Sequence, residues 1–161
     1  MQESKRVLPI NLKFVKDHSW ILLLLLAFCF KMYLILDFPM YMIQSRVDDQ
    51  LFINNAVELL RGNWFGDYNP YALNKMPGYT FFLTLPTILH LPLHIITEFF
   101  YDFSILFATI AFKSLLVKRW KRTVFILYLL YSPMCFVSAG MLRVYRTSIV
   151  APSVLLVVSG Y

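Results

Sequence analysis

Residues 48–82 read DDQLFINNAVELLRGNWFGDYNPYALNKMPGYTFF and form a charged, aromatic, turn-rich block between long apolar stretches. The whole chain is 59% hydrophobic and only 15% charged, and its mean hydropathy of +0.63 is far above that of a soluble domain. The block therefore predicts a loop outside the bilayer of an integral membrane protein. We expect an all-α, multi-pass membrane fold whose extracytoplasmic loop carries helices on the membrane surface.

The charged residues are distributed as membrane topology requires. The formal net charge is +6, and the basic residues gather in short clusters beside apolar stretches. This distribution favours membrane lipid headgroups over nucleic acid as partners. Cys29 and Cys135 both lie inside apolar segments, which is typical of small buried side chains and not of a disulfide or a metal site.

The first membrane span is predicted at residues 20–36. Basic residues precede it and place the N-terminus in the cytoplasm: Lys5, Arg6, Lys13 and Lys16. Residues 37–94 then form an outer loop, in which we expect surface helices at about 49–61 and 79–93.

The stretch 79–93 decides the rest of the topology. This stretch is short, and it is interrupted by Pro86, His90 and Pro92. If it were a membrane span, the basic residues 118–122 would lie outside the cell, which the positive-inside rule disfavours. We therefore predict further spans at residues 99–117, 123–139 and 148–161. Because the last holds about 14 residues, or about 21 Å of helix, it is too short for a ~30 Å bilayer core. We expect the chain to be the N-terminal module of a larger protein.

Two adjacent carboxylates, Asp48 and Asp49, open the polar block. Asp48 is well placed as the N-cap of the helix 49–61, and Gly62 suits the residue after its end, so capping explains the pair without any function. An apolar stripe follows at helical spacing and predicts a helix lying on the membrane: Phe52, Ala56, Leu59 and Leu60. Either carboxylate would then lie at the membrane surface, where a lipid-linked substrate presents its headgroup.

The order of residues along the block is more specific than any one of them. It contains, in sequence, Asp48, Asp49, Ala56, Leu60, Gly62, Trp64, Tyr71, Lys75, Pro77 and Tyr79. This order resembles the first outer loop of GT-C glycosyltransferases, specifically protein O-mannosyltransferases and lipid A aminoarabinose transferases (the glycosyltransferase family 39 type). Ser132-Pro133 also resembles a Ser-Pro pair that these families carry in their third span.

The resemblance implies an inverting transfer of a sugar from a polyprenyl phosphate or pyrophosphate to an acceptor on the extracytoplasmic side. Asp48 would be the general base, with Asp49 beside it, because the acceptor's proton must leave as the new bond forms. Lys75 would hold the departing phosphate, and Tyr79 would help to bind substrate. The alternative for Lys75 is a lysine that reaches along the membrane surface to water.

Other ionisable residues leave alternatives open. Arg143 and Arg146 would bind phosphate from a second outer loop, or simply flank a span. Glu98 and Asp102 could replace an acidic residue that the family often carries in that second outer loop, although solvated charges at a helix end are the simpler interpretation. Lys31 lies deep in the first span and is a functional candidate, or it extends toward the loop side.

The sequence therefore predicts a glycosyltransferase module of the cytoplasmic membrane that uses a lipid-linked sugar donor, with no cofactor and no metal. The acceptor, whether glycan, lipid or protein, is not readable from the sequence. Two other classes remain: a small non-catalytic membrane protein that binds polyprenyl lipid or a partner helix bundle, and a transporter fragment in which Lys31 lines a path.

Overall fold

The computed structural model describes residues 12–37, 40, 49–64, 77–132, 144 and 146–160. These residues form helices and no strand: α1 (Leu12–Ile35), α2 (Asp49–Leu60), α4 (Gly78–Leu89), α5 (Leu93–Ala111), the short 3-10 helix η1 (Phe112–Ser114), α6 (Arg119–Leu130) and α8 (Thr147–Gly160). The predicted all-α class is thus confirmed for the described part of the chain.

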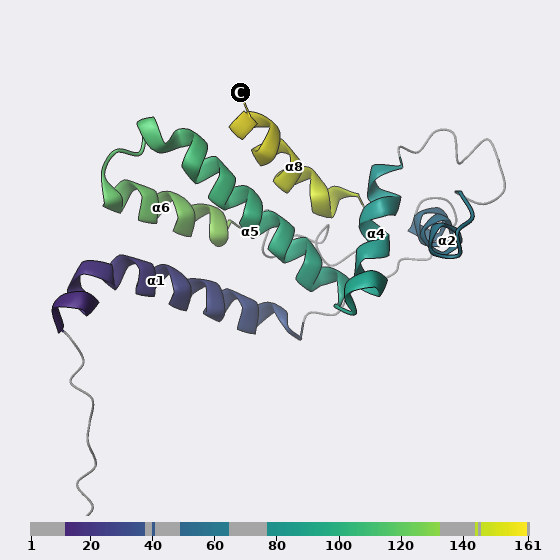
Figure 1. Cartoon of the computed structure of the whole chain (residues 1–161), viewed down its shortest axis with the longest axis horizontal. Helices are drawn as coiled ribbons and strands as arrows, with labels where there is room; N and C mark the ends of the chain where they lie inside the picture. The colour runs from purple at the N-terminus through teal and green to yellow at the C-terminus, as the bar shows by residue number, and fades with distance from the viewer. Residues whose placement is uncertain are drawn as a thin grey trace, which may run out of the picture.

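Helix α5 is the centre of the arrangement. It packs against α8, α6 and α1, while α4 turns away from the bundle at the corner where α5 begins (Figure 1). Helix α2 packs on α4 and lies beyond it, at the far end from α1 (Figure 1). The molecule therefore has two parts, a bundle of four helices and an α2–α4 pair at one end of it.

By length and composition, one of the described helices is suited to crossing a membrane. It is α5 continued through η1, which covers the 22 residues Leu93–Ser114. It begins at Leu93 and not at the predicted Phe99, because Pro92 supplies the start of the helix: its carbonyl accepts the N–H groups of Ile95 and Ile96. The other apolar helices are shorter, namely Ser19–Ile35, Gly78–Leu89 and Thr147–Gly160.

The predicted surface helix 79–93 is shorter in the structure and ends at Leu89. Pro86 lies inside α4 and does not interrupt it, contrary to the sequence prediction. The break comes instead at His90, which adopts a left-handed conformation with φ of 54° while its backbone N–H still bonds to the Pro86 carbonyl. This left-handed residue, followed by Pro92, makes the corner between α4 and α5.

Helix α2 ends in the way that its sequence predicts. Gly62 has φ of +86° and donates to the Leu59 carbonyl at 3.1 Å, while the Asn63 N–H reaches the Glu58 carbonyl at 2.9 Å. This pair of bonds is the Schellman motif, which satisfies carbonyl groups that the last helical turn leaves open.

The apolar stripe of α2 contacts protein, which differs from the prediction that it lies on the membrane. Phe52 is 1% exposed and Ala56 is also buried, both at the contact between α2 and α4. The Phe52 ring meets the edge of the Tyr79 ring, with centroids 5.1 Å apart and planes at 90°. Only the end of the stripe, at Leu60, stays exposed. An aromatic partner on α4 thus buries the face that the sequence assigned to lipid.

Small side chains let α5 and α8 approach closely. Ser104 and Ala108 on α5, and Ser148 and Pro152 on α8, are spaced four residues apart and are fully or almost fully buried. Such spacing brings helix backbones together without bulky side chains between them. The opposite side of α5 is apolar and exposed, at Phe99, Phe103, Leu106, Phe107 and Ile110. Exposed apolar side chains cover the outer faces of α1 and α8 as well, including Leu22, Leu25, Leu26, Val150, Val154 and Val157.

The left-handed turn at Gly62 provides a test of how α2 ends. No atom lies within 4 Å of the position that an added Cβ would take at Gly62 or at Gly78, so both sites have room for alanine. Only Gly62 has positive φ, and a left-handed L-residue costs about 1 kcal/mol. We expect Gly62→Ala to speed hydrogen exchange of the last amides of α2 by about fivefold, whereas Gly78→Ala leaves exchange in α4 unchanged or slower. Equal effects of the two substitutions would contradict this role of Gly62.

Candidate functional site

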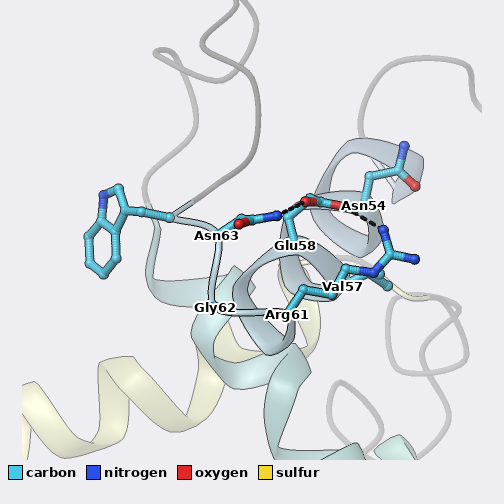
Figure 2. A pocket seen from close by; sticks show the side chains of 7 residues that line it. Asn54, Val57, Glu58, Arg61, Gly62 and Asn63 are labelled. Atoms are coloured by element: carbon cyan, nitrogen blue, oxygen red, sulfur yellow. Dashed lines mark hydrogen bonds and ion pairs between the residues drawn. The ribbon is translucent and has the colours of Figure 1, made fainter.

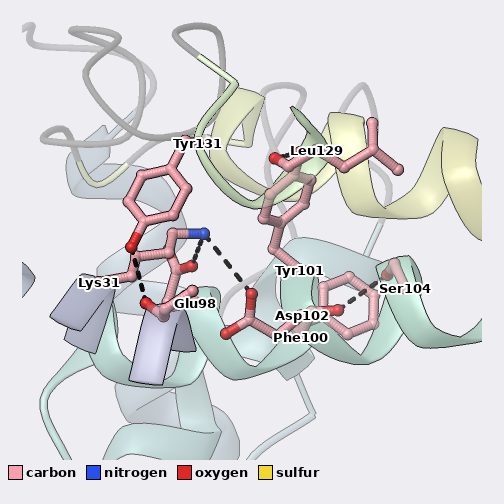
Figure 3. A network of polar contacts seen from close by, with 9 residues as sticks. Lys31, Glu98, Phe100, Tyr101, Asp102, Ser104, Leu129 and Tyr131 are labelled. Atoms are coloured by element: carbon pink, nitrogen blue, oxygen red, sulfur yellow. Dashed lines mark hydrogen bonds and ion pairs between the residues drawn. The ribbon is translucent and has the colours of Figure 1, made fainter. Parts of the chain in front are cut away.

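Three ionisable side chains meet inside the bundle. Lys31 of α1 is 0% exposed, and its ammonium forms an ion pair with the Glu98 carboxylate of α5 and lies 3.5 Å from Oδ1 of Asp102 (Figure 3). Glu98 and Asp102 are themselves only 3% and 8% exposed. We call Lys31, Glu98 and Asp102 the charged cluster.

The start of α5 explains why both carboxylates are buried. With the helix beginning at Leu93, Glu98 and Asp102 lie one and two turns inside it, spaced i, i+4 on the face toward α1. The interpretation of this pair as solvated charges at a helix end is therefore wrong. Lys31 does not extend toward the loop side either, because its ammonium ends between the two carboxylates (Figure 3).

Aromatic residues complete the surroundings of the charged cluster. The Tyr101 ring lies 4.9 Å from the Lys31 ammonium, within the range of a cation–π contact. The Tyr101 hydroxyl donates to the Leu129 carbonyl of α6 at 2.8 Å (Figure 3). The hydroxyl of Tyr131, the residue that follows the end of α6, donates to the Ala27 carbonyl of α1 at 2.7 Å. These two hydroxyls join α5, α6 and α1 around the cluster.

An apolar cavity of about 240 Å³ lies beside the cluster. Among the described residues, its wall contains one ionisable side chain, that of Asp102, and apolar side chains of α1, α5 and α6: Ile21, Leu24, Leu25, Phe28, Ile105, Leu106, Ile126 and Leu130. A cavity of this composition suits an apolar chain with one polar end.

A second cavity, of about 940 Å³ and open to solvent, lies at the end of α2. Its described lining consists of Asn54, Val57, Glu58, Arg61, Gly62, Asn63 and Trp64 (Figure 2). The Glu58 carboxylate accepts hydrogen bonds of 2.8 Å from Asn63 Nδ2 and from Arg61, and these bonds lower the pKa of Glu58. The end of α2 therefore presents an ionised carboxylate, a guanidinium and side-chain amides in fixed positions.

The residues predicted to perform chemistry are only partly described. Asp48, Lys75 and Arg143 lie outside the described residues. Asp49 is the first residue of α2, so Asp48 directly precedes this helix in the chain. Tyr79 is buried in the contact of α4 with α2. Arg146 is exposed and lies just before α8, where its carbonyl accepts the Ile149 N–H.

The sequence predicted Glu98 and Asp102 as a pair, but Lys31 was not predicted to contact them. The sequence does contain a signal for this contact. The apolar segment 20–36 carries one cation, Lys31, and the apolar segment that follows Pro92 carries two carboxylates, Glu98 and Asp102, spaced i, i+4. In an apolar environment opposite charges must pair, so this combination predicts a contact between the two segments.

No protein-family model matches the chain, and neither the curated proteins nor the solved structures contain a match.

The charged cluster should contribute strongly to stability, because removing one partner leaves the others buried without compensation. We expect Lys31→Met to destabilise the fold by about 3 kcal/mol. The matched control is Lys121→Met on α6, where the lysine is exposed and an effect below about 0.5 kcal/mol is expected. Reversible unfolding in mixed micelles, followed by circular dichroism, measures both. A loss for Lys31→Met no greater than that for Lys121→Met would contradict the role of the ion pairs.

Proposed function

We propose that this chain is the N-terminal module of an integral-membrane glycosyltransferase of the GT-C type. It would transfer a sugar from a polyprenyl-phosphate-linked donor to an acceptor on the extracytoplasmic side of the cell membrane. The proposal rests on the ordered residues from Asp48 to Tyr79 and on the cavity at the end of α2. In this proposal the bundle is embedded in the membrane, and the α2–α4 pair lies at its outer surface.

The end of α2 is the single observation that supports the proposal best. Trp64 is 73% exposed, and its ring packs against that of Phe81 with centroids 5.8 Å apart and planes at 60°. An exposed indole offers a flat apolar face to the C–H groups of a sugar ring, while carboxylate, guanidinium and amide groups pair with its hydroxyls. Glu58, Arg61 and Asn63 supply those groups beside Trp64 in the same cavity.

The arrangement of the helices supports the membrane topology. Helix α5 with η1 is about 33 Å long at 1.5 Å per residue, enough to cross a ~30 Å bilayer core. The α4–α5 corner and the turn into α6 lie at opposite ends of it (Figure 1). The second of these ends carries Lys118, Arg119, Lys121 and Arg122, as expected for the cytoplasmic side.

This topology predicts which residues a membrane-impermeant reagent reaches. We expect single cysteines at Asn74 and His90 to be labelled from outside intact cells, and a cysteine at Trp120 only after the membrane is opened. A background lacking Cys29 and Cys135 removes the native thiols. Labelling of position 90 only from the cytoplasmic side would contradict the placement of the α4–α5 corner.

In the proposed mechanism, Asp48 takes the proton of the acceptor hydroxyl or amine as it attacks the anomeric carbon of the donor. Inversion at that carbon follows from attack opposite the departing phosphate. Asp49, the first residue of α2, would support the base, since a negative charge is stabilised at a helix N-terminus. Lys75, Arg143 and Arg146 would hold the phosphate that leaves with the polyprenyl chain.

Substitution of Asp48 separates catalysis from capping. Asparagine caps a helix as well as aspartate does but has negligible basicity. In the complete gene product, we expect Asp48→Asn to retain donor binding and helicity yet to lower turnover by at least ~100-fold. Asp49→Asn is the matched control, with a milder expected loss. Transfer of radiolabelled sugar from polyprenyl phosphate donors in membrane vesicles measures the rate.

A lipid-binding protein without catalytic activity is the second candidate, and the apolar cavity beside Asp102 favours it. Wild-type turnover in Asp48→Asn would contradict the catalytic role of Asp48. If no sugar transfer occurs in any variant while polyprenyl phosphate binds saturably, the lipid-binding function is the correct one.

A further inference from the structure

The charged cluster carries an excess of negative charge when all its members are ionised. Lys31 supplies one positive charge, whereas Glu98 and Asp102 supply two negative charges, and all three residues are more than nine-tenths buried. An uncompensated charge in such a place costs several kcal/mol after relaxation of its surroundings. The cluster is therefore neutral only if it holds one more positive charge.

Few other ionisable groups face the cluster from the packed helices. On α5 these are Tyr101 and, one turn before Glu98, the half-buried His94. Just after α6 lies Tyr131, whose hydroxyl donates to the Ala27 carbonyl. Helix α8 has no ionisable side chain between Thr147 and Gly160. The described residues thus place no second lysine or arginine against Glu98 and Asp102.

We propose that Lys31, Glu98 and Asp102 form a buried proton-binding site, in which the two carboxyl groups share one exchangeable proton. The proton comes from solvent and binds to a carboxylate oxygen, giving one neutral carboxylic acid. The Lys31 ammonium then balances the remaining carboxylate, and the cluster has no net charge. The proposal rests on the bundle and is independent of glycosyl transfer.

The geometry assigns different parts to the two carboxyl groups. Glu98 forms the closer ion pair with Lys31, whereas the ammonium lies 3.5 Å from Asp102 Oδ1. Lys31 thus compensates Asp102 less closely than it compensates Glu98, and the two carboxyl groups share the proton. The spacing of Asp102 from Glu98, i, i+4 on one helix face, allows the proton to pass between the two groups.

His94 connects this site to the end of the bundle. It lies in the first turn of α5, near the α4–α5 corner, and i, i+4 spacing places it on the same face as Glu98. Its Nε2 is buried without a hydrogen-bond partner among the described residues. By this position, His94 is the group through which the proton of the site exchanges with solvent.

A proton fits this site better than a metal ion does. The Lys31 ammonium already occupies the space between the carboxylates, and it would repel a second cation. Among the described residues, no three His, Cys, Asp or Glu side chains converge as metal ligands. A proton needs only one oxygen and adds no volume.

Infrared spectroscopy of the full chain in lipid vesicles counts protonated carboxyl groups directly, because their C=O stretch is separate from that of carboxylates and shifts in D₂O. At neutral pH we expect the wild type to show a band equivalent to one buried carboxylic acid. Asp102→Asn and Glu98→Gln should each abolish it, since one carboxylate then balances Lys31. Lys31→Met should double it, because both carboxyl groups then need a proton.

The proposal is overturned if the wild-type band is absent, or if either amide variant keeps it. Loss of the band on adding sodium chloride, but not choline chloride, would also overturn it and assign the site to a metal cation. His94→Gln should keep the band but slow its exchange shift in D₂O at least tenfold. If Lys31→Met fails to fold, the two isosteric amide variants, checked by circular dichroism, still decide the outcome.

Discussion

The requirement that a charge inside the bundle be compensated governs how α1 and α5 pack. Lys31 lies in an otherwise apolar part of α1, and burying its ammonium alone would cost several kcal/mol. Only one register of the two helices brings it between Glu98 and Asp102. A shift of one helix along the other would break this ion pair and leave its charges buried without a partner. The charged cluster thus fixes the register, and the surrounding apolar side chains follow it.

The other specific contacts between helices of the bundle involve polar groups or small side chains. The hydroxyls of Tyr101 and Tyr131 satisfy carbonyls on neighbouring helices, and Ser104, Ala108 and Ser148 let α5 and α8 approach. Helices in lipid gain little from burying apolar surface, since lipid chains are as apolar as leucine. In such an environment, close packing and hydrogen bonds between helices would hold the bundle together. The exposed apolar faces of α1, α5 and α8 agree with a lipid environment on the outside.

Much of the fold was predictable from the sequence because local signals determine where helices end. Gly62 predicted the end of α2, and Pro92 marks the corner before α5. The charged cluster was not predicted, since the start of α5 was placed at Phe99, six residues late. That displacement left Glu98 outside the helix and Asp102 in its first turn, where solvation is the natural interpretation. The wrong start of α5 therefore led to the wrong prediction that Glu98 and Asp102 are exposed to solvent.

The partner of α2 could not be read from its own sequence either. The stripe containing Phe52 and Ala56 has the period of an amphipathic helix, which is the same for a helix on lipid and for one on protein. Only the fold of the chain after residue 77 brings Tyr79 against Phe52.

This contact has a consequence for the proposed chemistry. A helix held by α4 has a fixed position relative to α5, whereas a helix floating on lipid does not. General-base catalysis needs its carboxylate within hydrogen-bond reach of the acceptor, so a helix anchored through Phe52 is the better support for Asp48. Trp64 and Glu58 lie at the other end of this anchored helix. Packing of α2 on α4 thus connects the stability of the α2–α4 pair with the geometry that the proposed glycosyl transfer would require.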